Sequence, residues 1–206
     1  MTFPDDTFPD AGAYADAYFA AARRAADSVD REALKAAAAL LARAYENHAQ
    51  VFVCGNGGSA AISNHLVCDH LKGVQTDTGL RPRVISLASN METITAVAND
   101  ISYDEIFAYQ LRTLADAGDV LVSISSSGDS ENVVRACQWA KDNGLTVIAM
   151  TGFGGGRTRG LADVSLHVAG DNYGVVEDTH QSLMHILAQF LRLERMPADL
   201  IPQRKF

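Results

Sequence analysis

The stretch VFVCGNGGS, residues 51–59, decides the fold. Its four apolar residues predict a short buried strand, and the glycines that follow allow a sharp turn into a helix from about Ser59 to Leu71. The alternation recurs, with apolar runs at residues 84–88, 120–125, 147–152 and 166–170 and helical spacing at 91–98, 130–143 and 176–195. Such alternation is typical of a parallel sheet covered on both faces. We therefore expect one doubly wound α/β domain with five parallel strands.

The remaining segments lie before and within this core. Residues 1–12 contain two prolines and no apolar period, which predicts a flexible arm. Residues 13–49 are rich in Ala at helical spacing, and Asp30 is the expected cap between two helices. These helices form either a dimerisation element or an ordinary covering layer. Residues 13–206 are thus predicted to be a single domain, with a mobile glycine-rich loop at 152–160.

The composition limits the classes of partner. The 206 residues include 17 Lys and Arg against 25 Asp and Glu, a net charge of -8, which argues against nucleic acid or an anionic membrane as the main partner. No apolar run reaches membrane-spanning length, and the acidic start of the chain is unlike a secretory signal. Cys54, Cys68 and Cys137 are widely spaced, which predicts buried thiols in a cytoplasmic protein. Because the chain is acidic overall, any anionic ligand must be bound by groups gathered at one local site.

Two loops at predicted strand ends carry the polar groups that an anion needs. Residues 55–59, GNGGS, combine flexible glycines with Asn56 and with Ser59, which is positioned to cap the following helix. Residues 125–130, SSSGDS, place four hydroxyls at a helix start, a neutral cradle for phosphate. The alternatives are a tight strand-to-helix turn for the first loop and a serine-rich turn with one capping serine for the second.

A third pattern places metal-ligating side chains on two helices. His65 and Asp69 are four residues apart, as are Glu177, Gln181 and His185 in the last helix. Two histidines with carboxylates are ligand chemistry for zinc or a similar divalent ion. The alternatives are a helical ion pair for His65 and Asp69 and a core histidine at position 185. The other four histidines are not predicted ligands: His48, His70, His167 and His180.

These motifs resemble the sugar isomerase (SIS) domain family, specifically its phosphoheptose isomerase branch, over residues 15–195. The GNGGS and SSSGDS loops, the AND and YDEIF segments and the last-helix histidine carry the resemblance. It implies a flavodoxin-like fold and a homotetramer with one zinc per subunit. The implied activity is conversion of sedoheptulose 7-phosphate to D-glycero-D-manno-heptose 7-phosphate.

The resemblance also implies roles for individual residues. The implied substrate-binding residues, with Ser59 added from the loop pattern, are Asn56, Gly57, Gly58, Ser59, Asn99, Asp100, Ser125, Ser126, Ser127, Ser130 and Glu177. The implied metal ligands are His65, Asp69, Glu177 and His185, of which Asp69, Glu177 and His185 are also the candidate catalytic residues. For Asn99 and Asp100 the plainer alternative is a polar helix end.

Three positions depart from the family pattern: Asp69 replaces Glu, Glu177 replaces Gln, and Asp129 replaces Asn. Asp69 is shorter by one methylene, and misplacement by about 1 Å can cost about 100-fold in rate. Glu177 adds a negative ligand, which would bind a cation more tightly while lowering its Lewis acidity. We therefore hypothesise that Glu177 performs the work of the longer acid. Asp129 brings a carboxylate close to the expected phosphate.

Two rival functions remain open at this point. One is a non-catalytic SIS protein that binds phosphosugar or a protein partner, like the replication-initiator-associating relatives. Those relatives lack the metal-site residues, whereas His65 and His185 are both present here, which favours an enzyme. The other is a metal-free isomerase of smaller sugar phosphates that uses Glu177 and His185 alone.

Overall fold

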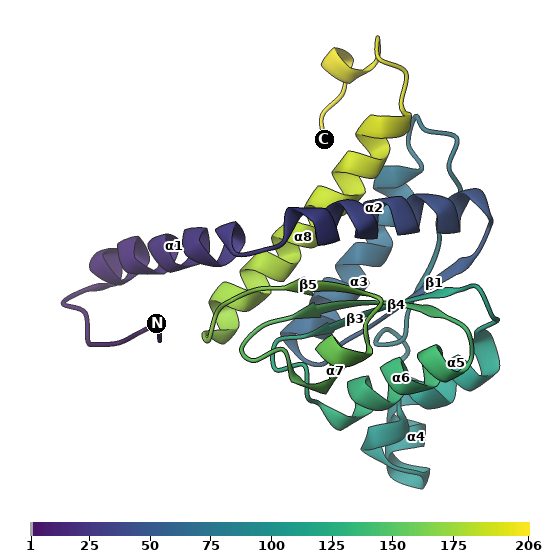
Figure 1. The fold of residues 1–206 in the computed structure, drawn as a ribbon, viewed down its shortest axis with the longest axis horizontal. Coiled ribbons are helices and arrows are strands. Elements are labelled where there is room, and N and C mark those ends of the chain that lie inside the picture. The colour runs from purple at the N-terminus through teal and green to yellow at the C-terminus, as the bar shows by residue number, and fades with distance from the viewer. Residues whose placement is uncertain (1) are drawn as a thin grey trace.

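The computed structural model describes residues 2–206 and contains a five-stranded parallel sheet in the order β2-β1-β3-β4-β5 (Figure 1). The strands are β1 Gln50–Cys54, β2 Arg83–Ser86, β3 Val120–Ser125, β4 Thr146–Thr151 and β5 Val164–His167. Each lies within a few residues of a predicted apolar run, and β3 is buried along its whole length. This strand order is that of flavodoxin-like doubly wound folds. The predicted fold class is confirmed.

Helices cover both faces of the sheet. The helices are α1 Ala11–Asp27, α2 Arg31–Glu46, α3 Gly58–Cys68, α4 Met91–Asp100, α5 Ala108–Leu114, α6 Glu131–Asp142, α7 Gly156–Leu161 and α8 Tyr173–Arg195. Helices α2, α3 and α8 form one layer, and α5, α6 and α7 lie on the opposite face (Figure 1). Each layer encloses its own apolar core, so the sheet is buried on both sides. Burial on both faces explains why its strands are continuous apolar runs.

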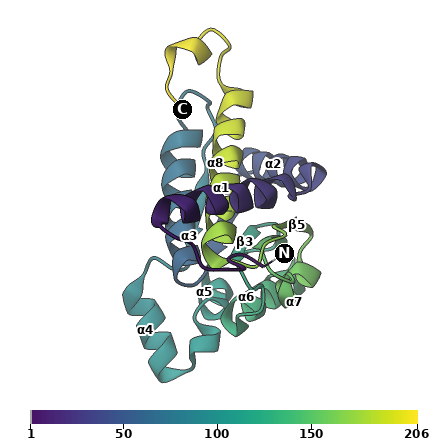
Figure 2. The same cartoon turned by 90° about the vertical axis from the view of Figure 1, so that its left-hand side faces the viewer.

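The N-terminal helices meet as expected at Asp30. Its carboxylate accepts hydrogen bonds from the backbone amides of Glu32 and Ala33, which caps α2. Helix α2 packs on the sheet and on α8. Helix α1 also packs on α8, and its N-terminal part extends away from the body of the molecule (Figures 1 and 2). The predicted arm, residues 1–12, includes Met1, which lies outside the described residues. The flexibility of the arm and the role of the two N-terminal helices in dimerisation both stay predictions.

Two sequence expectations about the fold are wrong, and one helix was not predicted. Cys68 is exposed because it ends α3 on the solvent side, whereas Cys54 and Cys137 are buried as predicted. Residues 156–161 of the expected mobile loop form helix α7, which packs on α6 and β4. Helix α5 was not predicted, although it buries Leu111 against the second core. Helices of six or seven residues are too short to leave a clear periodic signal.

The switch in strand order places the two predicted loops side by side. Strand β1 pairs with β2 on one side and β3 on the other, with Cys54 in register with Ser123. Both strands are parallel, so the loops that follow them leave the same edge of the sheet. These are the glycine loop, GNGGS at residues 55–59, and the serine loop, SSSGDS at residues 125–130. In open α/β sheets, ligands bind at this edge, at the point where the strand order reverses.

His180 makes folding stability depend on pH. Its side chain on α8 is fully buried, and burial lowers its pKa to about 4 from an ordinary value of 6.5. The unfolded chain binds this proton below about pH 6.5 and the folded chain does not. The contribution of His180 to the free energy of unfolding is therefore fully present above pH 6.5 and is lost as the pH falls toward 4. Each pH unit in that window costs about 1.4 kcal/mol per proton.

We expect His180→Leu to reduce the pH dependence by about one proton, because leucine fills the site without a titrating group. The rest of the dependence remains, since burial also lowers the pKa of His70 to about 4. Urea unfolding at a series of pH values between 7 and 4 measures the free energy of unfolding directly. An unchanged slope in the variant would contradict the assignment of this proton uptake to His180.

Among residues 2–206, no helix has the length and apolar character needed to cross a membrane. The cytoplasmic location remains a prediction from the cysteine pattern.

Candidate active site

The two loops at the switch point are joined by a pair of amide side chains. Asn56 Nδ2 donates to Asn132 Oδ1 and Asn132 Nδ2 donates to Asn56 Oδ1, each at 2.9 Å. The Tyr103 hydroxyl also donates to Asn56 Oδ1, at 3.0 Å. Asn132 is 1% exposed, so this pairing is fixed inside the protein. The glycine loop, the start of α6 and the YDEIF segment are thereby held in one arrangement.

The glycine loop enters α3 without a side-chain cap. Gly57 occupies the N-cap with φ of 54°, a conformation that favours glycine. Ser59 lies inside the helix and is buried, so its predicted capping role is wrong. A Cβ on Gly58 would lie 2.3 Å from Glu177 Oε2, so the end of the Glu177 side chain packs directly on the backbone of Gly58 where α3 meets α8. The structure thus brings the Glu177 carboxylate to the start of α3, next to the glycine loop.

The serine loop holds itself open through its own hydroxyls. Ser125 Oγ accepts the amide of Gly128 at 3.1 Å, and Ser127 Oγ accepts the amide of Asp129 at 3.2 Å. A hydroxyl that accepts in this way still has its hydrogen to donate. Such hydroxyls can hold phosphate without a cation.

Two further hydroxyls of the serine loop are not used in local structure. Ser130 is the N-cap of α6, yet within residues 2–206 its side chain makes no capping hydrogen bond. Ser126 Oγ is buried and has no hydrogen-bond partner in the described part of the chain. Ser130 therefore does not act as the single capping serine of the alternative, and the phosphate cradle stays a prediction.

Asn99 and Asp100 form the last two residues of α4. Asn99 Nδ2 donates to Asp100 Oδ1 at 2.8 Å, and both side chains are exposed. This position agrees with the alternative that the two residues form a polar helix end. Their contact with substrate stays a prediction.

Three of the four predicted metal ligands converge. His65, Asp69 and His185 each present a ligand atom within 4.8 Å of the others. Asp69 Oδ1 lies 3.3 Å from His65 Nε2, and Asp69 Oδ2 lies 3.6 Å from His185 Nε2. Tetrahedral zinc with bonds of about 2.1 Å separates its ligand atoms by about 3.4 Å. The donor set and its spacing therefore fit a divalent ion with three protein ligands and an open position.

Gln181 stands between the two histidine rings. Its Nε2 lies 3.0 Å from His65 Nδ1 and 3.1 Å from His185 Nε2. On His65 the amide faces the ring nitrogen opposite the one that faces Asp69, whereas on His185 it faces the same nitrogen, Nε2, as Asp69 does. Glu177 lies outside the group of three ligands within the described residues, two turns of α8 before His185. Its role as the fourth ligand stays a prediction.

A change of helix type positions Asp69. Helix α3 ends at Cys68, and residues Asp69–Val74 continue as a π-helix. Such π-helical turns are rare and often lie at functional sites. The next residue, His70, is fully buried, and its Nδ1 is hydrogen-bonded to the Tyr45 hydroxyl of α2. A buried contact from the N-terminal helices thus anchors the turn that carries Asp69.

Sequence reasoning missed Asn132, Tyr103 and Gln181 as parts of the site. Gln181 could have been predicted, because it lies on the same four-residue spacing as Glu177 and His185. Asn132 and Tyr103 carry no such signal. Their partner, Asn56, is distant in sequence, and only the strand order brings the three together.

Comparison with known proteins agrees with these motifs. The SIS domain family model matches residues 14–152. The phosphoheptose isomerase of Alteromonas mediterranea is 36% identical over 178 residues, which cover 85% of this chain and 89% of that protein. The phosphoheptose isomerase of Helicobacter pylori strain P12 is 37% identical over 157 residues, covering 76% of this chain and 81% of that protein.

Solved structures give the same result. The structure of phosphoheptose isomerase from Neisseria gonorrhoeae has a TM-score of 0.78 and 33% identity, covering 86% of this chain and 96% of that one. The structure from Francisella tularensis has a TM-score of 0.81 and 32% identity, covering 88% and 96%. By its motifs, its strand order and these relatives, the chain belongs to the phosphoheptose isomerase family of SIS-domain proteins.

Proposed function

We propose that this protein is an aldose–ketose isomerase that converts sedoheptulose 7-phosphate to D-glycero-D-manno-heptose 7-phosphate. The observation that carries the proposal is the convergence of His65, Asp69 and His185 on helices that border the glycine loop. A non-catalytic phosphosugar-binding protein has no need of such a ligand set. Relatives named phosphoheptose isomerase, at 36% and 37% identity, support the same assignment.

The serine loop is proposed to bind the substrate phosphate. Donors from Ser125, Ser126, Ser127 and Ser130 surround the start of α6, whose free amides favour an anion. On the other side of the switch point, Asn56 and the backbone of Gly57 and Gly58 are proposed to bind the sugar. The phosphate then fixes one end of the sugar, so that its carbonyl end extends along α3 toward His65 and Asp69.

The reaction moves a proton between C1 and C2 of the sugar through an enediolate. His65, Asp69 and His185 are proposed to hold one zinc ion per subunit, which would act as a Lewis acid toward the carbonyl oxygen. Glu177 is proposed to move the proton between the carbons, because Asp69 is already engaged by both histidines. His185 is proposed to exchange a proton with the substrate oxygens.

The decisive experiment is incubation with sedoheptulose 7-phosphate while aldose formation is followed. Turnover that is lost with a chelator and restored by zinc is expected. Turnover that survives complete metal removal would instead favour the metal-free isomerase. Binding of the phosphosugar with no turnover under any metal condition would favour the non-catalytic protein.

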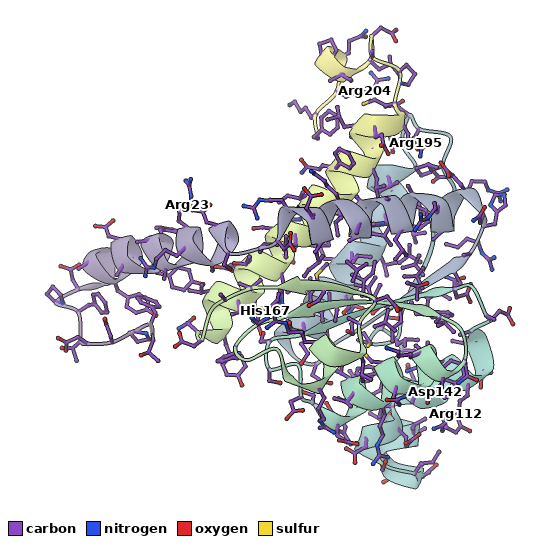
Figure 3. All side chains as sticks on the ribbon, in the orientation of Figure 1. Arg23, Arg112, Asp142, His167, Arg195 and Arg204 are labelled. Carbon is purple, nitrogen blue, oxygen red and sulfur yellow. The ribbon has the colours of Figure 1, made fainter. Side chains whose placement is uncertain are left out.

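We propose that the protein assembles as a homotetramer through its N-terminal helices and α8. An apolar groove between α2 and α8 is lined by Leu34, Ile186 and Phe190, and the last two are about half exposed. Phe19 is 69% exposed on α1, and Arg23 of the same helix points away from the body (Figure 3). A solution mass of four chains by light scattering is expected, and a monomer would contradict the proposal.

A further inference from the structure

The serine loop contains a carboxylate where an anion is proposed to bind. Asp129 lies between Gly128 and Ser130, so its charge is part of the loop itself. Its side chain is 56% exposed and therefore remains in contact with solvent. An uncompensated carboxylate at this position would repel a phosphate dianion.

Arg157, at the start of α7, holds this carboxylate. Its Nε donates to Asp129 Oδ1 at 2.5 Å, and a second nitrogen donates to the Asp129 carbonyl at 3.0 Å. A third contact joins Arg157 to Glu131, in the first turn of α6, at 2.8 Å. The hydrogen bond from Arg157 also holds the pKa of Asp129 below its ordinary value, so Asp129 is ionised at neutral pH.

The contact between the two loops is fixed by backbone packing. A Cβ on Gly128 would lie 2.0 Å from the Gly155 carbonyl oxygen, and a Cβ on Gly156 would lie 2.4 Å from atoms of Gly128. The amide of Thr158 also donates to the Gly128 carbonyl at 2.9 Å. Glycine at these positions allows α7 to begin directly against the serine loop. Arg157 is therefore held within reach of Asp129 by the fold, independently of its own ion pair.

We propose that Arg157 is a positioning residue for phosphate recognition, which neutralises Asp129 and so allows the serine loop to accept a phosphate dianion. This inference rests on the proposed function of the loop. Arg157 acts through Asp129 and does not itself contact the phosphate. Asp129, Glu131 and Arg157 together carry one net negative charge, and Glu131 is also paired with Arg135 at 2.9 Å, so the four side chains are formally neutral.

Charge counting predicts an order of affinity. Arg157→Gln adds one net negative charge to the group, Asp129→Asn removes one, and the double variant returns to the original value. We expect Arg157→Gln to weaken phosphate binding about tenfold, the effect of about 1.4 kcal/mol of added repulsion. Asp129→Asn is expected to bind as tightly as the wild type or more tightly. The double variant is expected to lie within about threefold of the wild type.

The test is calorimetric titration of the purified full-length protein with inorganic phosphate, repeated with sedoheptulose 7-phosphate. Arg157→Lys keeps the charge and is expected to retain most of the affinity. Arg159→Gln, two residues along the same helix, is the matched control, because Arg159 makes no ion pair with any described residue. Added salt is expected to shrink the defect of Arg157→Gln, since screening weakens repulsion between exposed charges.

Three results would overturn the inference: unchanged affinity in Arg157→Gln, a double variant as weak as Arg157→Gln, or an equal loss in Arg159→Gln. The second would mean that Arg157 contacts the phosphate itself. Thermal unfolding of each variant checks that it is folded. We expect all of them to fold, because the backbone hydrogen bonds of Gly128 and Ser126 do not involve the substituted side chains. Absence of phosphosugar binding by the wild type would instead contradict the proposed function.

Discussion

Replacing His185 by Gln is expected to lower the turnover number for sedoheptulose 7-phosphate by about 10³-fold, the middle of the range for loss of a positioned acid or base. His185 is proposed both to exchange protons with the substrate and to hold the metal. Glutamine cannot exchange a proton at neutral pH, and its amide is a weaker metal ligand than imidazole. Steady-state kinetics with zinc in excess measures the effect. Metal content of the purified variant shows how much of the loss comes from weaker binding of the ion.

The control for this substitution is His48→Asn. His48 lies between α2 and β1, at the opposite end of β1 from the glycine loop, and has φ of 57°, which Asn tolerates well. We expect its turnover to equal that of the wild type. Activity of His185→Gln within tenfold of the wild type, in a folded protein, would contradict the role of His185.

The sequence predicted the sheet and both loops because their signals are local. An apolar run followed by a glycine or serine turn is visible within a dozen residues, and parallel strands must end at one edge. The four-residue spacing of His65 and Asp69, and of Gln181 and His185, likewise places each pair on one helix face. The convergence of the two pairs depends on how α3 packs against α8.

The features that escaped prediction depend on contacts between distant segments. Arg157 reads as one more charge in a glycine-rich stretch, and only the packing of α7 on the serine loop joins it to Asp129. The π-helix at Asp69 lacks a sequence signal, since its widened turn is stabilised by burial of His70 against Tyr45. Cys68 lies in an apolar segment, and its exposure follows from the direction in which α3 faces its neighbours.

Glu177→Gln separates the roles of the two carboxylates. Because Glu177 lies outside the group of three metal ligands, we expect the variant to keep its metal. Its turnover is expected to fall by about 100-fold, since glutamine cannot take a proton from carbon. Asp69→Asn is expected to lose both metal and activity, because Asp69 faces both histidines at 3.3 and 3.6 Å.

Metal analysis of each purified variant, alongside its turnover number, distinguishes these outcomes. Glu194→Gln is the matched control on the exposed side of α8 and is expected to behave as the wild type. A Glu177→Gln protein that loses its metal would make Glu177 the fourth ligand and leave Asp69 as the candidate base. Full activity in both Glu177→Gln and Asp69→Asn would remove these two carboxylates from the mechanism.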